Sequence, residues 1–173
     1  QGIDLRDVGS GGTGATNVLR TLGKKASVAV LVLDFLKGLL PVLAARWLGL
    51  DAWWIAAVAV ATVIGHCWSP FIGFKGGKGV ATGGGASIAL FPPVLLVIPV
   101  ILLVIWQTRY VSLGSLLGAG LAVVLAVAFA LAGQLPWAFV LAIAAIAAII
   151  VFRHRENIDR LRTGQERKLG PKA

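Results

Sequence analysis

Residues 80–106, VATGGGASIALFPPVLLVIPVILLVIW, decide how this chain is arranged, because they form a long apolar stretch without a charged side chain. Its middle carries the pair Pro92 and Pro93. Proline removes a helical hydrogen bond and clashes with the preceding turn, so the stretch predicts two short helices, 80–91 and 94–106. Each would be roughly 20 Å long at 1.5 Å per residue, which is short for a hydrocarbon core of about 30 Å. We therefore expect tilted neighbouring helices or a locally thin region around them.

The composition places the protein in a membrane. Of 173 residues, 58% are hydrophobic and only 13% are charged, whereas apolar residues approach half of a soluble domain. The net charge of +9 would suggest nucleic acid in a soluble protein. Here the basic groups flank apolar segments, a pattern that excludes a nucleic-acid partner and favours a lipid bilayer and anionic substrates.

Four further apolar segments bring the predicted spans to six. They cover residues 27–50, 52–66, 113–131 and 137–152. With six crossings, nearly every lysine and arginine falls on one side, taken as the cytoplasm by the positive-inside rule. Arg46 is the main exception, and Lys37 lies within a span. The sequence therefore predicts an all-α, polytopic membrane helix bundle that forms a single domain over residues 1–173.

Three polar segments share the predicted cytoplasmic side, and the first is residues 9–17, GSGGTGATN, followed by Arg20. It contains G-x-G-x-x-G, but a dinucleotide site also needs a preceding strand and a later acidic residue. Glycine-rich backbone before a helix nevertheless suits an anion. We expect Ser10, Gly11, Thr16 and Asn17 to contact phosphate, with the Arg20 guanidinium binding it bidentately.

The second polar segment is residues 73–79, GFKGGKG. Its spacing does not match a P-loop, yet Lys75 and Lys78 stand beside exposed glycine backbone just before a predicted helix. This arrangement again favours an anion, although a simple positive-inside turn is the alternative. His66 precedes the segment and is interpreted as an interfacial residue at the end of a span.

The third polar segment is residues 153–160, RHRENIDR. His154 and Asn157 are spaced to lie on one helix face. His154 and Asp159 also match the H-x-x-x-x-D spacing of soluble-type glycerolipid acyltransferases, which we interpret as a coincidence, because i and i+5 diverge on a helix. With only two histidines and no acidic cluster beside them, the sequence predicts no metal site. The single cysteine, Cys67, excludes an intrachain disulfide.

Asp34 and Lys37 are charges three residues apart inside a predicted span. Such a pair can simply neutralise itself. Ionisable groups within a membrane usually serve a function, so we expect this pair to support the site from below.

Taken together, these segments resemble a known family, the bacterial membrane glycerol-3-phosphate acyltransferases that use acyl phosphate. The resemblance runs from end to end and rests on three ordered motifs. They are GSG…GATN…R at 9–20, D…KG at 34–38 with GH…GFKGGKGVAT at 65–82, and RH…NI…RL…G…E…K at 153–168. There are departures, since Gly12 stands where the family usually has Asn, and Pro70 comes one place late.

The resemblance implies seven membrane helices, of which the first would precede this chain. It implies transfer of a fatty acyl group from acyl phosphate to the 1-hydroxyl of glycerol 3-phosphate, without coenzyme A or another cofactor. It further implies a site at the cytoplasmic face of the bacterial inner membrane and a functional coupling to the soluble enzyme that makes acyl phosphate. The catalytic groups that it implies are His154, Ser10, Arg20 and Lys78. The substrate-binding residues that it implies are Ser112 and Asn157.

Two alternatives remain open from the sequence. A transporter or channel for a small anion could use the same broken helices and intramembrane charges, although no internal repeat is visible. A structural assembly subunit would not need three glycine-rich or basic segments. Within the acyltransferase hypothesis, the hydroxyl proton could be taken by His154 or by substrate phosphate, and the residues do not choose between them.

Overall fold

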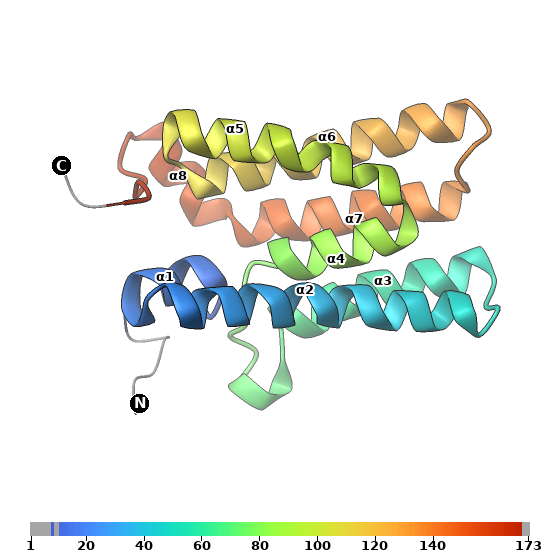
Figure 1. Cartoon of the computed structure of the whole chain (residues 1–173), viewed down its shortest axis with the longest axis horizontal. Helices are drawn as coiled ribbons and strands as arrows, with labels where there is room; N and C mark the ends of the chain where they lie inside the picture. Colours follow the sequence, from blue (N-terminus) through green and yellow to red (C-terminus); the bar gives the residue numbers. More distant parts are fainter. Residues whose placement is uncertain (1–7, 9–10, 171–173) are drawn as a thin grey trace.

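The computed structural model describes Val8 and residues 11–170. These residues form eight α-helices and two short 3-10 segments, and none of them lies in a strand. The elements in chain order are α1 (Ala15–Leu22), α2 (Lys24–Trp47), α3 (Ala52–Cys67), η1 (Pro70–Ile72), α4 (Val80–Leu90), η2 (Pro92–Val97), α5 (Ile98–Thr108), α6 (Val111–Leu131), α7 (Trp137–Arg153) and α8 (Arg155–Arg162). The predicted all-α bundle is confirmed (Figure 1).

Helices occupy all six positions where the sequence predicts spans. Among the described residues, three stretches are long and apolar enough to cross a membrane by themselves: Lys24–Trp47, Ala52–Ile72 and Val111–Leu131. The helix α7 meets the same test together with α8, across a bend of 60°. Large apolar side chains such as Leu33 (65% exposed) and Trp47 (87% exposed) cover the outside of α2, as expected for a helix that faces lipid rather than water.

The break at the proline pair is confirmed. The helix α4 ends at Leu90, and the chain restarts at Pro92 as a 3-10 segment that leads into α5. Prolines are tolerated at the start of a helix because the first N–H groups have no helical partner. The chain therefore turns back where the sequence requires it.

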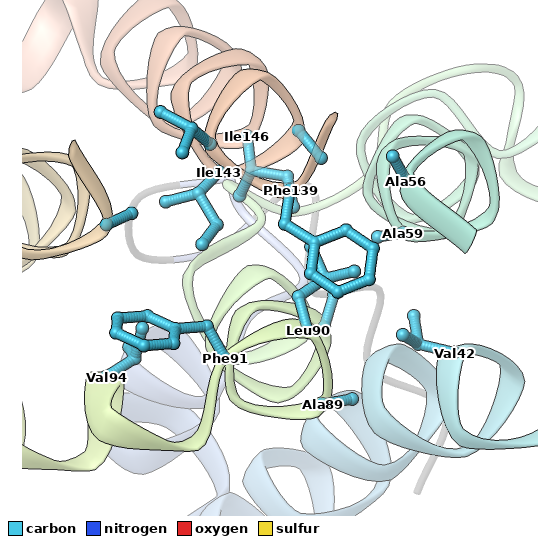
Figure 2. Close-up of a cluster of buried hydrophobic side chains, with 14 of the residues drawn as sticks. Val42, Ala56, Ala59, Ala89, Leu90, Phe91, Val94, Phe139, Ile143 and Ile146 are labelled. Atoms are coloured by element: carbon cyan, nitrogen blue, oxygen red, sulfur yellow. The ribbon is translucent and has the colours of Figure 1, made fainter. Parts of the chain in front are cut away.

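The short helix α4 lies in the middle of the bundle and packs on α2, α3 and α7. Figure 2 shows Leu90 of α4 near Phe139 and Ile143 of α7, with Ala59 of α3 and Val42 of α2 beside them. At 1.5 Å per residue, α4 spans only roughly 16 Å. Protein surrounds this helix, so it does not have to match the thickness of the lipid core. This explains how α4 can be shorter than the hydrocarbon core.

Glycines allow α2 and α4 to touch through their backbones. A Cβ atom on Gly38 would lie 2.0 Å from the carbonyl oxygen of Thr82, and one on Gly85 would lie 2.2 Å from the carbonyl oxygen of Phe35. Small residues at helix contacts are the usual means of close packing within membranes. These two glycines therefore fix how deeply α4 sits.

Arg46, the exception to the charge asymmetry, has a structural role at the far end of α4. Its Nη1 donates to the carbonyl oxygens of Ala89 at 2.6 Å and Leu90 at 3.3 Å. The last carbonyls of a helix lack partners within that helix, and a cation at this end also suits the helix dipole. Arg46 thus provides hydrogen-bond donors for the last carbonyl groups of a helix that ends inside the bundle.

Candidate active site

The three polar segments meet at one end of the bundle. In Figure 1, the start of α4 faces the end of the bundle that carries α1 and α8. The first segment leads into α1, the second precedes α4, and the third joins α7 to α8. The helix count from the sequence brings these segments together, and the structure agrees on that point. The side of the membrane on which this end lies stays a prediction.

Glu166 is the centre of a hydrogen-bond network at this end. Its Oε1 accepts from Asn157 Nδ2 at 2.7 Å and from Ser112 Oγ at 2.9 Å. Its Oε2 accepts from Arg160 Nε at 2.9 Å. Burial raises the pKa of this carboxyl, but the hydrogen bonds from Asn157, Arg160 and Ser112 outweigh burial and leave the pKa below its ordinary value. Glu166 is therefore a carboxylate, although its side chain is only 7% exposed.

Lys78 joins the network through Asn157, whose Oδ1 accepts a short hydrogen bond from Lys78 Nζ. Burial lowers the pKa of this lysine, and the nearby Glu166 carboxylate opposes that shift. The Asn157 side-chain amide therefore connects Lys78, the predicted phosphate-binding cation, to the Glu166 carboxylate. Of the expected site residues, Lys78 and Asn157 are in direct contact, and Ser112 joins them through Glu166.

Arg20 lies at the edge of the same cluster. Its Nη2 donates to the carbonyl oxygen of Arg167 at 3.3 Å. Partial burial and the neighbouring Arg167 cation lower its pKa, and Glu166 acts in the opposite sense. The arginine remains exposed, so it is a cation available to a ligand at the mouth of the network.

The glycine loop before α4 is held by a second arginine, Arg153. Its Nη2 donates to the carbonyl oxygen of Gly76 at 2.8 Å, and its Nε donates to that of Gly77 at 3.1 Å. In a trans peptide the N–H points away from the carbonyl, so the N–H groups of Gly77 and Lys78 point away from Arg153. Successive N–H groups beside a helix N-terminus suit an anion.

His154 lies at the break between α7 and α8 and is buried. The prediction that it shares one continuous helix with Asn157 is wrong, because the two helices meet at 60°. Its Nδ1 lies 2.8 Å from the carbonyl oxygen of Ile150. Burial lowers the pKa of His154 to about 4, so the ring is neutral near pH 7. A neutral ring that donates from Nδ1 leaves Nε2 as the nitrogen able to accept a proton. Asp159 is exposed, in keeping with the interpretation of its spacing as a coincidence.

The first polar segment is described only in part, and Ser10 lies outside the described residues. The side chain of Asn17 is buried and donates to the carbonyl oxygens of Val8 at 3.1 Å and Gly12 at 2.9 Å. Asn17 therefore shapes this loop from within. Gly11 has a left-handed φ of 67°, a conformation that favours glycine.

Two expected ligands of phosphate stand apart from the Glu166 network. Thr16 is half-buried in the first turn of α1, and Lys75 is exposed on the glycine loop. Their contacts with substrate stay predictions.

Asp34 and Lys37 belong to a separate group of polar side chains. Lys37 Nζ lies 2.6 Å from Asp34 Oδ1, and both line a cavity of about 450 Å³. The other lining residues are Thr13, Thr62, Gly65, His66, Ser69 and Ile72. The supporting role expected of this pair therefore has to act through its neighbours, since the pair is not part of the Glu166 network.

The comparisons with known proteins agree with this geometry. The family model for glycerol-3-phosphate acyltransferase matches residues 1–164. The chain belongs to this family. A glycerol-3-phosphate acyltransferase of Deinococcus radiodurans is 49% identical, over 99% of this chain and 85% of the relative. That of Rubrobacter xylanophilus is 48% identical, over 98% of this chain and 83% of the relative.

A solved structure shares the fold. The crystal structure of PlsY, an integral membrane glycerol 3-phosphate acyltransferase, in its glycerol 3-phosphate form has a TM-score of 0.90 at 46% identity. The match covers 98% of this chain and 84% of that chain. The lysophosphatidic acid form of PlsY has a TM-score of 0.85 at 45% identity, with 93% of this chain and 81% of that chain covered. The present protein is thus an acyltransferase of the same membrane fold.

Sequence reasoning gave no site role to three residues of this acyltransferase that the structure places at the site: Glu166, Arg160 and Arg153. For Glu166 the available signals are its place in the third family motif and its position as an acidic residue inside a basic tail, at positions 160–168 of the sequence. A buried carboxylate among cations is usually there to hold them, but the sequence alone does not show that Glu166 is buried. Arg153 belongs to the third polar segment, but the sequence gives it no role of its own, because its forked contact with the glycine loop depends on the fold.

Proposed function

We propose that this acyltransferase transfers a fatty acyl group from acyl phosphate to the 1-hydroxyl of glycerol 3-phosphate. The products are lysophosphatidic acid and inorganic phosphate, the outcome of a first acylation in phospholipid synthesis. The observation that carries the proposal is the network of Lys78, Asn157, Ser112 and Glu166 beside two loop N–H groups at the start of α4. Both proposed substrates and both products carry phosphate, which this network suits.

The reaction balances without a covalent intermediate on the protein. The 1-hydroxyl oxygen forms a bond to the acyl carbonyl carbon, and the bond from that carbon to the phosphate oxygen breaks. Phosphate leaves with the bonding electrons, and its negative charge is offset by Lys78 and Arg20. Alignment of two bound reactants can supply a large part of the rate enhancement.

The hydroxyl proton goes to substrate phosphate in this proposal. His154 is buried, hydrogen-bonded through Nδ1 to Ile150, and has a pKa lowered to about 4, which makes it a weak proton acceptor at neutral pH. Its Nε2 can still accept a hydrogen bond and orient the attacking hydroxyl. Of the two alternatives open from the sequence, the structure therefore supports phosphate as the base and His154 as an orienting group.

Cys67 does not fit the part of a nucleophile. It is fully buried in the last turn of α3, where neither substrate can reach its sulfur. This burial supports direct transfer, and we expect a Cys67→Ala variant to keep its activity.

We place the protein in the bacterial inner membrane with the site at the cytoplasmic face, where a soluble enzyme that makes acyl phosphate can deliver the donor. The segregation of basic residues supports this orientation. In a Cys67→Ala background, cysteines at Lys75 and Arg155 should react with an impermeant thiol reagent only from the cytoplasm, and one at Gln134 only from outside. All three positions are exposed. Labelling of Lys75 and Arg155 from opposite faces would contradict the orientation.

The reaction itself is tested with the purified protein, a long-chain acyl phosphate and glycerol 3-phosphate. Mass spectrometry should detect lysophosphatidic acid, and a phosphate assay should detect inorganic phosphate in equal molar amount. Phosphate release without acylated product would contradict the proposal, as would the absence of both.

A further inference from the structure

His66 lies in direct contact with the glycine loop that carries Lys78. It is in the last turn of α3, and its side chain is only 6% exposed. A Cβ atom on Gly77 would lie 2.3 Å from His66 Nε2 and 2.7 Å from its Cε1. A Cβ atom on Gly76 would lie 2.0 Å from the backbone carbonyl oxygen of His66. Real atoms do not approach so closely, so a side chain at position 76 would meet the backbone of α3, and one at position 77 would have to displace the His66 ring.

Asp34 of α2 lies beside this histidine. Its Oδ1 lies 3.7 Å from His66 Nδ1 and 2.6 Å from Lys37 Nζ. The first distance is too long for a hydrogen bond but is within the range of an electrostatic contact. His66 lines the same cavity as Asp34 and Lys37 and also contacts the glycine loop, so it lies between this pair and the loop.

Arg153 of α7 holds the same loop by hydrogen bonds. Its guanidinium donates two hydrogen bonds, one to the carbonyl oxygen of Gly76 and one to that of Gly77. The imidazole of His66 contacts Gly77 as well. The two residues before Lys78 are thus held between a side chain from α3 and one from α7.

We propose that His66 is a positioning residue, whose ring holds Gly76 and Gly77 against Arg153 so that Lys78 and the loop N–H groups face the substrate phosphate. The inference deepens the proposed function and rests on it. His66 does not touch the reacting atoms. It acts through the loop, and a displacement of about 1 Å there is enough to cost up to a hundredfold in rate.

A double-mutant cycle tests this contact. Gly77→Ala drives a methyl group into the imidazole, and we expect kcat/KM to fall about a hundredfold. His66→Ala leaves the loop without its support, and we expect a loss of about tenfold. The double variant places the new methyl in the space left by the ring. Its kcat/KM should exceed that of Gly77→Ala by about fivefold or more, because the effects of substitutions at residues in contact are not additive.

Three controls separate this contact from a general loss of packing. Gly76→Ala clashes with the backbone of His66, so adding His66→Ala should not rescue it. Gly84→Ala meets nothing within 4 Å and should keep its activity. His66→Gln retains a planar polar side chain beside Gly77 and should keep more activity than His66→Ala. Since the cavity of about 450 Å³ reaches His66, added imidazole should also raise the activity of His66→Ala.

A readout independent of activity distinguishes failure of this inference from failure of the proposed function. The rate of trypsin cleavage after Lys75 reports loop order in detergent, and it should rise in His66→Ala and fall back in His66→Gln. Additive effects in the cycle, or equal cleavage rates in all variants, would overturn the role of His66. A wild-type protein that makes no lysophosphatidic acid, yet shows these cleavage differences, would instead overturn only the proposed reaction.

Discussion

The substitution Glu166→Gln removes the charge at the centre of the site and keeps the shape of the side chain. Glutamate accepts hydrogen bonds at both oxygens, from Asn157 and Ser112 at one and from Arg160 at the other. Glutamine must place a donating NH2 group toward one of these sides, so at least one charge-assisted hydrogen bond is lost. Such a bond contributes about 1.5–3 kcal/mol.

A loss of about 2 kcal/mol in positioning corresponds to roughly a 30-fold fall in kcat/KM at about 1.4 kcal/mol per tenfold. The assay is the initial rate of lysophosphatidic acid formation, with a thermal melt of each variant in the same detergent. Glu156→Gln is the matched control, because Glu156 also faces Arg160, at 3.8 Å, but is 73% exposed. Exposed ion pairs contribute about 0–1 kcal/mol, so this variant should stay near wild type. Near-wild-type kcat/KM in Glu166→Gln would refute the reasoning.

Three further outcomes are expected. Because the pKa of His154 is lowered to about 4, the folded protein binds a proton at this ring only near pH 4, and it loses stability as the pH falls from about 6.5. In a His66→Gln variant, the NMR signal of the one remaining histidine should show no titration step at about pH 6–7. Arg20→Lys should lose nearly as much activity as Arg20→Ala, because an ammonium lacks the guanidinium fork, and full activity of the lysine variant would show that charge alone matters. Gly38→Ala should lower the yield of folded protein, since its Cβ meets a backbone oxygen of α4 at 2.0 Å, whereas Gly84→Ala, with open space around it, should match wild type.

The helical architecture is accessible from the sequence because apolar spans and proline breaks are local signals. Pro92 and Pro93 predict the end of α4, which the structure places at Leu90. The burial of α4 inside the bundle is a different matter. It depends on which helices surround it and on Gly38 and Gly85, whose close contacts involve residues far away in the chain.

The sequence predicts the cations of the candidate site, but not the hydrogen bonds that join them. Glycine and lysine before a helix favour an anion site, so a role for Lys78 could be predicted from the sequence. Glu166 could not, because its three partners come from α6 and α8, and only the fold shows that they converge. His66 was interpreted as an interfacial residue for the same reason, since its contact with Gly77 is a property of the packed loop.

The choice of acyl donor tests the central claim most directly. One preparation of the purified protein is assayed for lysophosphatidic acid with a long-chain acyl phosphate and, separately, with the acyl-coenzyme A of the same chain, both with glycerol 3-phosphate. A site built from Lys78, Arg20 and loop N–H groups stabilises a leaving phosphate, so we predict turnover with acyl phosphate, inhibition by inorganic phosphate and no product from acyl-coenzyme A. Equal turnover of both donors, retained in Lys78→Ala, would contradict the account.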